Sequence, residues 1–271
     1  MNILIRNVNY HVKICGNGEP ILLLHGFTGD GTTWEFISHY LQNYQLIFVD
    51  ILGHGKTDSP TDRRRYRMEE VVEDIKEILQ YLKIDRTNMI GYSMGGRLAL
   101  SFAITYPQCV RRLVLESSSP GLKKELERKE RQSSDEALAE FILQNGIESF
   151  VDYWENIPLF KSQNNLPEAV QKKIRAQRLQ NTPIGLANSL RGMGTGFQPS
   201  WWEQIKNLYI PVLLLCGEWD VKFCRIAEDM ERTMPNAIKN TIKSAGHAIH
   251  VEQPRIFGKI VNEFFHRFSE R

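Results

Sequence analysis

The feature that most constrains the fold is a serine flanked by glycines, placed between an apolar run and an apolar helical segment. The stretch GYSMG (residues 91–95) ends the run TNMIGYS and leads into MGGRLALSFAITY. A strand that turns this sharply into a helix forces strained backbone angles on Ser93, and the glycines remove Cβ atoms that would clash with the turn. The Ser93 hydroxyl then lies at a helix N-terminus, where developing negative charge is stabilised. This setting favours a reactive serine over a Gly-Ser loop without chemistry.

Around this turn, short apolar runs alternate with longer segments of helical period. In the segment 68–82, apolar residues recur at the three- and four-residue steps of an amphipathic helix. Such alternation is typical of an α/β fold, with a mostly parallel sheet covered by helices on both faces. The runs that predict strands are 20–26, 44–50, 87–93, 110–117, 210–220 and 237–247, and the helical segments are 32–41, 68–82, 94–106, 221–233 and 254–268.

The alternation stops from about residue 118 to residue 207. This stretch is polar and helical, has no strand candidate and contains several prolines. We expect it to be a helical insertion of roughly ninety residues, near the lower size of a separate unit. The predicted organisation is a core of residues 1–117 and 208–271, with residues 118–207 inserted after a strand as a lid over the active-site face.

A reactive serine at neutral pH needs a base, and the base needs an orienting acid. The chain order Ser…Asp…His, typical of a serine at such a turn, is provided by Ser93, Asp220 and His247. Two alternatives remain. Glu116 ends the strand after the helix that follows the serine, so it is a second candidate for the acid. His250 lies three residues after His247, and we expect a supporting or substrate-facing role for it.

The stretch HGFTGD (residues 25–30) follows the first buried strand. In this architecture the loop after that strand supplies one backbone N–H of an oxyanion hole, and the residue after the serine supplies the other. The expected donors are Phe27 and Met94. We expect His25 to brace the loop by hydrogen bonds, and His54, in the glycine-containing loop DILGHGKTD, to be structural.

Composition argues against several other classes of function. The four cysteines form no C-x-x-C pair and have no histidine at metal-ligand spacing, which speaks against a metal site and a disulfide framework. A net charge of +2 gives no sign of nucleic-acid binding. No apolar run reaches the length of a signal peptide or a membrane span. We therefore expect a cytoplasmic protein that binds neither nucleic acid, metal nor membrane.

Seven stretches resemble the sequences of a known family. They run in order through the core and the insertion: GYSMGGRLAL, LESSSPGL, RQSSDEAL, FVDYWENIPLF, RGMGTGFQPSWW, CGEWDVKF and GHAIHVEQP. The chain resembles the α/β-hydrolase superfamily over nearly its whole length. Within it, the chain is similar to the 2-succinyl-6-hydroxy-2,4-cyclohexadiene-1-carboxylate synthases of menaquinone biosynthesis. The resemblance implies a lyase that needs no cofactor and eliminates pyruvate from 2-succinyl-5-enolpyruvyl-6-hydroxy-3-cyclohexene-1-carboxylate. This small-molecule substrate bears three carboxylates, and we expect a monomer to act on it.

Arg97 is unusual for the start of a buried helix. On a helix that begins at Met94 it lies one turn from Ser93, on nearly the same face. A guanidinium is costly to bury without an anion. Either it pairs with a core carboxylate such as Asp50 or Glu116, or it binds a substrate carboxylate with two parallel hydrogen bonds. Ester hydrolysis does not call for this arginine, whereas a carboxylate-rich substrate does.

The resemblance also implies substrate contacts from four further residues: Tyr92, Arg131, Trp154 and Arg178. Two nearby arginines leave the assignment open, since Arg128 precedes Arg131 by three residues and Arg175 precedes Arg178 by three. Either pair fits equally well the surface of a charged helix. We expect Trp201 and Trp202 to anchor the end of the lid to the core.

The hypothesis that follows is proton abstraction rather than covalent catalysis. His247, oriented by Asp220, would keep Ser93 ready to remove the ring proton next to the succinyl ketone, and the two amides would stabilise the enolate oxygen. The triad itself fits equally well an esterase or a carbon–carbon bond hydrolase that forms an acyl-enzyme. A small-molecule receptor on a retained hydrolase fold is a third possibility, which an intact triad disfavours.

Overall fold

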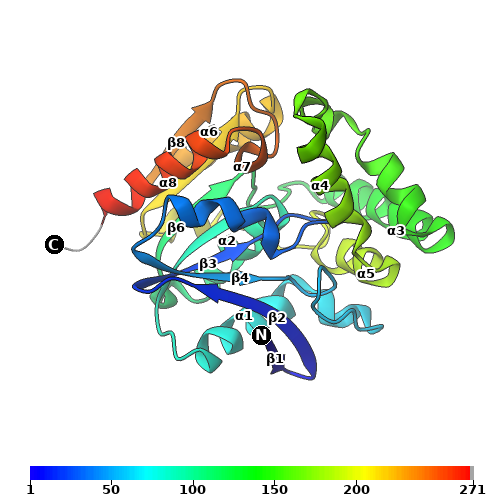
Figure 1. The fold of residues 1–271 in the computed structure, drawn as a ribbon, viewed down its shortest axis with the longest axis horizontal. Coiled ribbons are helices and arrows are strands. Elements are labelled where there is room, and N and C mark those ends of the chain that lie inside the picture. The colour runs from blue at the N-terminus through cyan, green and yellow to red at the C-terminus, as the bar shows by residue number, and fades with distance from the viewer. Residues whose placement is uncertain (269–271) are drawn as a thin grey trace.

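The structure is a computed structural model that describes residues 1–268, and it is built on one eight-stranded sheet (Figure 1). The strand order is β1-β2-β4-β3-β5-β6-β7-β8. From β4 to β8 every neighbouring pair is parallel, and β1 and β2 are antiparallel additions at one edge. The strands are β1 (Asn2–Ile5), β2 (Val8–Cys15), β3 (Glu19–Leu24), β4 (Tyr44–Val49), β5 (Thr87–Tyr92), β6 (Val110–Glu116), β7 (Val212–Gly217) and β8 (Ala237–Ile242).

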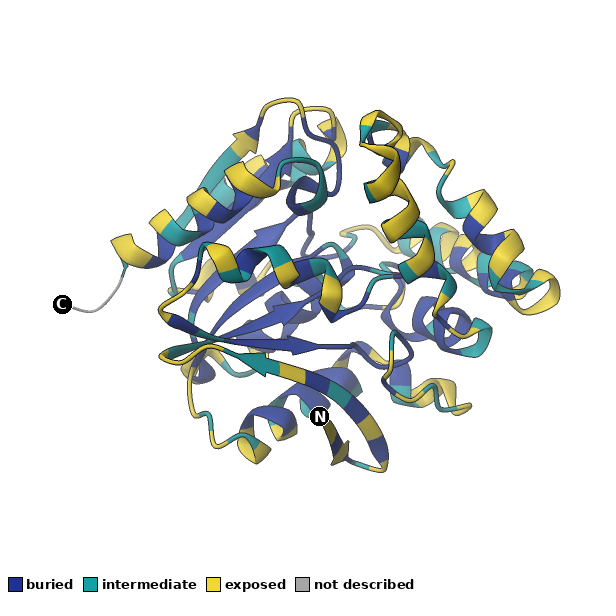
Figure 2. Cartoon of the chain, viewed as in Figure 1, coloured by how far each residue is buried: buried dark blue, intermediate teal, exposed yellow. Residues whose placement is uncertain are grey.

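Helices cover both faces of the sheet, as the sequence predicted. Successive side chains of a strand point to opposite faces, so the residues of β3 divide between two apolar cores. Leu22 and Leu24 pack in one core, and Ile21 and Leu23 pack in the other. Figure 2 shows the central strands as almost continuously buried and the outer helices as buried on one side only. The helices of the core are α1 (Met68–Tyr81), α2 (Met94–Thr105), α6 (Val221–Thr233), α7 (Ile249–Glu252) and α8 (Pro254–Arg267).

The antiparallel hairpin of β1 and β2 was missed in the sequence. Its turn is formed by Arg6 and Asn7, which both have positive φ angles of 46° and 65°. Burial alternates along both strands, with Ile3 and Ile5 inward in β1 and Val8, Tyr10 and Val12 inward in β2. This period of two, broken by a turn, was the available signal.

Residues 118–207 lie between β6 and β7 and contain no strand. They lie beside the carboxyl ends of the parallel strands, where α3, α4 and α5 are grouped in Figure 1. Seven fully or nearly buried apolar residues, among them Phe150 and Leu186, form a core of their own within these helices. The α3 helix is broken at Gly146, which has a φ of 76°. The elements of this segment are α3 (Glu125–Trp154), η4 (Pro158–Asn165), α4 (Glu168–Leu179), α5 (Pro183–Met193) and η5 (Gln204–Asn207).

Trp201 and Trp202 fix the end of this segment, as we expected. The indole N–H of Trp201 donates to Ser101 Oγ in α2 at 2.8 Å. The indole N–H of Trp202 donates to the carbonyl oxygen of Gly121 at 2.9 Å. Both rings pack against the larger apolar core. None of the helices within residues 1–268 is long and apolar enough to cross a membrane.

Candidate active site

The turn at Ser93 has the strained geometry that its flanking glycines suggested. Ser93 has φ 49° and ψ −106° and is the N-cap of α2. A Cβ at Gly91 would collide with the carbonyl of Gly95, and one at Gly95 would collide with the carbonyl oxygen of Leu24 in β3. The backbone N–H of Ser93 donates to the carbonyl oxygen of Glu116 at 2.9 Å, which ties the turn to the end of β6. The sheet therefore holds the serine in a conformation that most side chains avoid.

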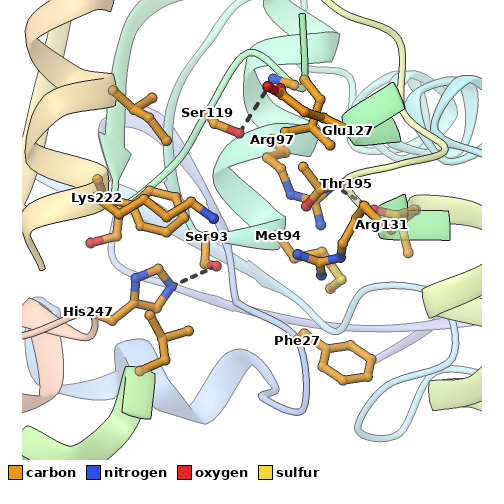
Figure 3. Close-up of a pocket in the computed structure, with 18 of the residues that line it drawn as sticks. Phe27, Ser93, Met94, Arg97, Ser119, Glu127, Arg131, Thr195, Lys222 and His247 are labelled. Atoms are coloured by element: carbon orange, nitrogen blue, oxygen red, sulfur yellow. Dashed lines mark hydrogen bonds between the residues drawn. The ribbon is translucent and has the colours of Figure 1, made fainter. Parts of the chain in front are cut away.

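Ser93, His247 and Asp220 form a continuous hydrogen-bonded chain, of which Figure 3 shows the bond between Ser93 and His247. His247 Nε2 lies 3.0 Å from Ser93 Oγ, and His247 Nδ1 lies 2.6 Å from Asp220 Oδ2. The three side chains come from the loops after β5, β7 and β8, because parallel strands end at the same edge of the sheet. His247 and Asp220 are buried, and the ring of Phe223 lies 4.7 Å from the His247 ring. The arrangement orients the imidazole so that one nitrogen can accept the serine proton.

The alternative acid and base form a separate buried pair. Glu116 accepts hydrogen bonds from the backbone N–H of His250 at 3.0 Å and from its ring Nδ1 at 2.9 Å. His250 Nε2 lies 2.9 Å from Thr33 Oγ1. Glu116 thus contacts His250 rather than His247, and it does not orient the histidine beside Ser93. Its carboxylate and its backbone carbonyl together connect β6, the Ser93 turn and α7.

The predicted oxyanion-hole donors lie beside Ser93. Met94 is the first residue of α2, so its N–H has no acceptor inside the helix. Phe27 lies in the loop after β3, and its side chain lines the same cavity as Ser93. The Phe27 ring contacts Trp154 edge to face, with 5.4 Å between ring centroids. Both residues therefore line the cavity into which Ser93 opens.

His25 braces the Phe27 loop, which confirms the expectation from the sequence. Its Nε2 accepts the backbone N–H of Ile51 at 2.9 Å, and its Nδ1 donates to the carbonyl oxygen of Gly26 at 2.8 Å. Burial lowers the pKa of His25. The neighbouring His54 is also buried, and burial together with His25 lowers its pKa to about 3. Both rings are neutral structural groups at neutral pH.

Ser93 and His247 open onto a cavity of about 720 Å³ between the sheet edge and the helices of residues 118–207. Tyr92, Arg131 and Trp154 also line it, which places three of the predicted substrate contacts at the serine. Five cationic side chains and three carboxylates lie along the wall, so the cavity suits an anion. The five cations are Arg97, Lys123, Lys124, Arg131 and Lys222.

Arg97 lines this cavity and pairs with neither of the core carboxylates considered for it. Its Nη1 donates to the carbonyl oxygen of Met193 and to Gln198 Oε1, both at 2.5 Å. Within residues 1–268 its Nε and Nη2 have no hydrogen-bond partner, and it makes no ion pair. Asp50 instead lies 3.1 Å from His11 Nδ1. Burial, and to a lesser degree the nearby guanidinium of Arg131, lower the pKa of Arg97. An anion bound in the cavity would stabilise the charged form of Arg97 against both effects.

The structure distinguishes the two members of each arginine pair by their contacts. Arg131 lines the cavity and donates through Nε to Asp135 Oδ1 at 2.8 Å, with 41% of its side chain exposed. Arg128 does not line the cavity, and its Nε lies 3.4 Å from the carbonyl oxygen of Gly196. Arg175 is held by two carboxylates on the surface. These contacts favour Arg131 over Arg128 at the cavity.

The structure does not bring Arg178 to the Ser93 cavity. It is 6% exposed and lines a separate cavity of about 50 Å³ behind Tyr92. Its Nη2 donates to Gln163 Oε1 at 3.1 Å, and its guanidinium lies 4.9 Å from the Phe160 ring centroid. Burial lowers its pKa. The reason is the orientation of α4, which turns this side chain toward the core rather than toward the serine.

Sequence reasoning missed Lys222 as a cavity residue. It is the second residue of α6, directly after the loop that carries Asp220. Its position two residues after the predicted acid was the available signal, because side chains of such loops gather at the carboxyl edge of the sheet. Among residues 1–268, no group of histidine, cysteine, aspartate and glutamate side chains could hold a metal ion.

The fold and the site together define a class. A mostly parallel sheet that carries a strained serine between a strand and a helix, with a histidine and an aspartate in later loops of the same edge, has the arrangement of an α/β enzyme with a serine triad. The family model described as alpha/beta hydrolase fold matches residues 19–254.

Individual proteins that are similar to this chain narrow the class further. A Bacillus subtilis protein provisionally named 2-succinyl-6-hydroxy-2,4-cyclohexadiene-1-carboxylate synthase is 53% identical over 91% of this chain and 90% of its own. The synthase of that name from Salmonella typhimurium is 31% identical over 88% of this chain and 90% of its own. The structure of MenH from S. aureus superimposes with a TM-score of 0.92 at 37% identity, covering 96% and 99% of the two chains. The chain therefore belongs to the alpha/beta hydrolase fold family and, within it, to the 2-succinyl-6-hydroxy-2,4-cyclohexadiene-1-carboxylate synthases.

Proposed function

We propose that the protein eliminates pyruvate from 2-succinyl-5-enolpyruvyl-6-hydroxy-3-cyclohexene-1-carboxylate to give 2-succinyl-6-hydroxy-2,4-cyclohexadiene-1-carboxylate, a step of menaquinone biosynthesis. The observation that carries the proposal is Arg97, a guanidinium that lines the Ser93 cavity and whose Nε and Nη2 have no hydrogen-bond partner among residues 1–268. A half-buried cation of this kind is stabilised by a bound carboxylate. The substrate has three carboxylates, and cations outnumber carboxylates along the cavity wall.

The chemistry begins with the proton on the ring carbon next to the succinyl ketone. Ser93 removes this proton and passes its own to His247 Nε2, which lies 3.0 Å from Ser93 Oγ. Asp220, 2.6 Å from the other ring nitrogen, stabilises the imidazolium that forms. The electron pair of the broken C–H bond becomes an enolate, whose oxygen is the charge to be stabilised.

The enolate then collapses and the leaving group departs. Its electrons form a new double bond in the ring, the existing ring double bond shifts by one position, and the bond from ring carbon 5 to the enolpyruvyl oxygen breaks. The enolpyruvate takes up a proton and becomes pyruvate. We propose that the N–H groups of Phe27 and Met94 stabilise the enolate oxygen, a contribution that typically amounts to ~10²–10³ in rate for each donor.

The remaining assignments complete the proposal. We assign substrate binding to Tyr92, Arg97, Arg131 and Trp154. Arg178 would reach the substrate only if α4 moved, because it now lies outside the cavity. Residues 118–207 would act as a lid over a core of residues 1–117 and 208–271. We also propose that the enzyme acts as a monomer and that it works in the cytoplasm.

The test is pyruvate release from the enolpyruvyl substrate by purified protein, beside hydrolysis of p-nitrophenyl acetate. We expect rapid pyruvate release that is lost in Ser93→Ala, and only slow ester cleavage. The same triad would also attack an ester, so hydrolysis is the competing activity. Brisk ester cleavage without pyruvate release would replace the lyase by a hydrolase that forms an acyl-enzyme.

A further inference from the structure

Lys222 is a cation of the cavity that the proposed reaction has not yet used. It enters from α6, and Figure 3 shows it extending toward Ser93 from the side opposite Arg97 and Arg131. Its Nζ lies 5.7 Å from the centroid of the Phe223 ring, which in turn lies 4.7 Å from the His247 ring. Lys222 therefore lies on the side of the cavity near the catalytic histidine.

The ammonium of Lys222 has no carboxylate partner within residues 1–268. Several other charges of the cavity wall are paired. Lys124 lies 3.4 Å from Glu127, and Asp229 lies 2.8 Å from Arg232. The carboxylate nearest to Lys222 in the chain, Asp220, is held by His247. Lys222 is thus available to an anion beside the triad.

Lys222 also stands at the border of a second, more open cavity. This outer cavity of about 660 Å³ lies between η4 and the loop after β7. Lys222, Leu159 and His247 line both cavities. Trp219, 53% exposed, lines the outer cavity only. An anion bound to Lys222 therefore lies next to the outer cavity, on the side of Ser93 away from the arginines.

We propose that Lys222 binds the carboxylate of the enolpyruvyl group and guides the departing pyruvate into the outer cavity, an inference that rests on the proposed function. Three carboxylates of one substrate repel one another and are accommodated best when each meets its own cation. Arg97 and Arg131, on the far side of Ser93, then hold the part of the substrate that remains. Elimination splits the substrate between these two sides.

The test compares Lys222→Met with Arg225→Met, which removes a charge of the same sign from the same helix outside both cavities. In Lys222→Met we expect KM for the substrate, and the inhibition constant of added pyruvate, to rise on the order of tenfold, as for a lost charged hydrogen bond. Lys222→Arg should restore most of the affinity. Arg225→Met should leave both constants within twofold of the unaltered protein.

A third readout separates the two proposals. Labelling of Ser93 by a neutral fluorophosphonate needs the triad but no carboxylate binding, so its rate should be the same in Lys222→Met. If the unaltered protein releases pyruvate and Lys222→Met keeps both constants within twofold, the assignment of Lys222 is wrong and the lyase stands. An equal effect of Arg225→Met would reduce the role of Lys222 to bulk charge and overturn the assignment. If the unaltered protein releases no pyruvate, both proposals fall.

Discussion

Replacement of Arg97 gives the sharpest test of why a guanidinium lies one turn from Ser93. Its Nη1 is engaged by the carbonyl oxygen of Met193 and by Gln198 Oε1, at 2.5 Å each. The edge formed by Nε and Nη2 has no partner in the described part of the chain. That edge has the geometry to donate two parallel hydrogen bonds to a carboxylate. We therefore expect one bidentate carboxylate contact, and no more, to be lost with Arg97.

The expected loss of activity follows from the two hydrogen bonds of this contact. A hydrogen bond to a charged group contributes about 1.5–3 kcal/mol net, so we expect Arg97→Met to lose about 3 kcal/mol of transition-state binding, since the two bonds share one carboxylate. That loss lowers kcat/KM roughly a hundredfold. Arg97→Lys keeps the charge but not the fork, and we expect a loss of about tenfold. Arg97→Met also leaves Gln198 and the Met193 carbonyl without this donor, which lowers the free energy of unfolding by about 1–3 kcal/mol.

The assay is the initial rate of pyruvate release at several substrate concentrations, for both variants and the unaltered protein. Fluorophosphonate labelling of Ser93 and thermal unfolding are the controls, because they report the triad and the fold without a substrate carboxylate. The reasoning is refuted if kcat/KM for Arg97→Met stays within threefold of the unaltered protein. A parallel fall in labelling would refute it as well, because Arg97 would then support the structure of the turn rather than bind substrate.

Three further changes probe the turn, the tryptophan anchor and the buried histidines. Gly95→Ala places a Cβ against the carbonyl oxygens of Leu24 and His25, so we expect lower thermal stability and loss of fluorophosphonate labelling; normal labelling would show that the turn tolerates a side chain. Trp201→Phe removes the 2.8 Å hydrogen bond to Ser101, and we expect a loss of about 1 kcal/mol, seen as a Tm about 2–4 °C lower. His54 stays neutral in the folded chain because its pKa is about 3, whereas in the unfolded chain it takes up a proton below its ordinary pKa of about 6.5. Its contribution to stability is therefore complete above pH 6.5 and declines as the pH falls, by up to ~1.4 kcal/mol per pH unit. Urea unfolding between pH 4 and 7 should show a shallower decline for His54→Leu, and equal slopes would contradict this.

The core elements could be predicted because their patterns are local. The helix expected at 221–233 is α6, with the bounds Val221–Thr233. The strands β4, β5, β6 and β7 fall within the apolar runs that predicted them, and β3 begins one residue before its run. The hairpin of β1 and β2 was missed because its strands are half exposed and become part of the sheet only by pairing of β2 with β4 at the edge. The amphipathic segment at 32–41 is a 3₁₀ helix, η1 (Gly31–His39), whose tighter turn the spacing of apolar residues does not reveal.

The candidate site also has one part that could be predicted from the sequence and one part that could not. Ser93, Asp220 and His247 could be proposed from a motif and a chain order, and the structure places them within hydrogen-bond distance. The orientation of the helical segment could not be predicted from periodicity. Arginines three residues apart share a helix face, so only tertiary packing decides that Arg131 lines the cavity and Arg128 does not. Packing of α4 likewise decides that Arg178 lines a different cavity.

The place of residues 118–207 between β6 and β7 has a consequence for chain entropy. These two strands are neighbours, and their pairing aligns Leu113 with Val212, so it closes a loop of roughly a hundred residues. The entropy of closing a flexible loop grows with the logarithm of its length, and doubling the loop adds only about 0.6 kcal/mol. The entropy cost of pairing β6 with β7 thus depends only weakly on the length of the segment between them. Substrate specificity can change by exchange of that segment, while the strands on either side keep the serine, the acid and the base in register.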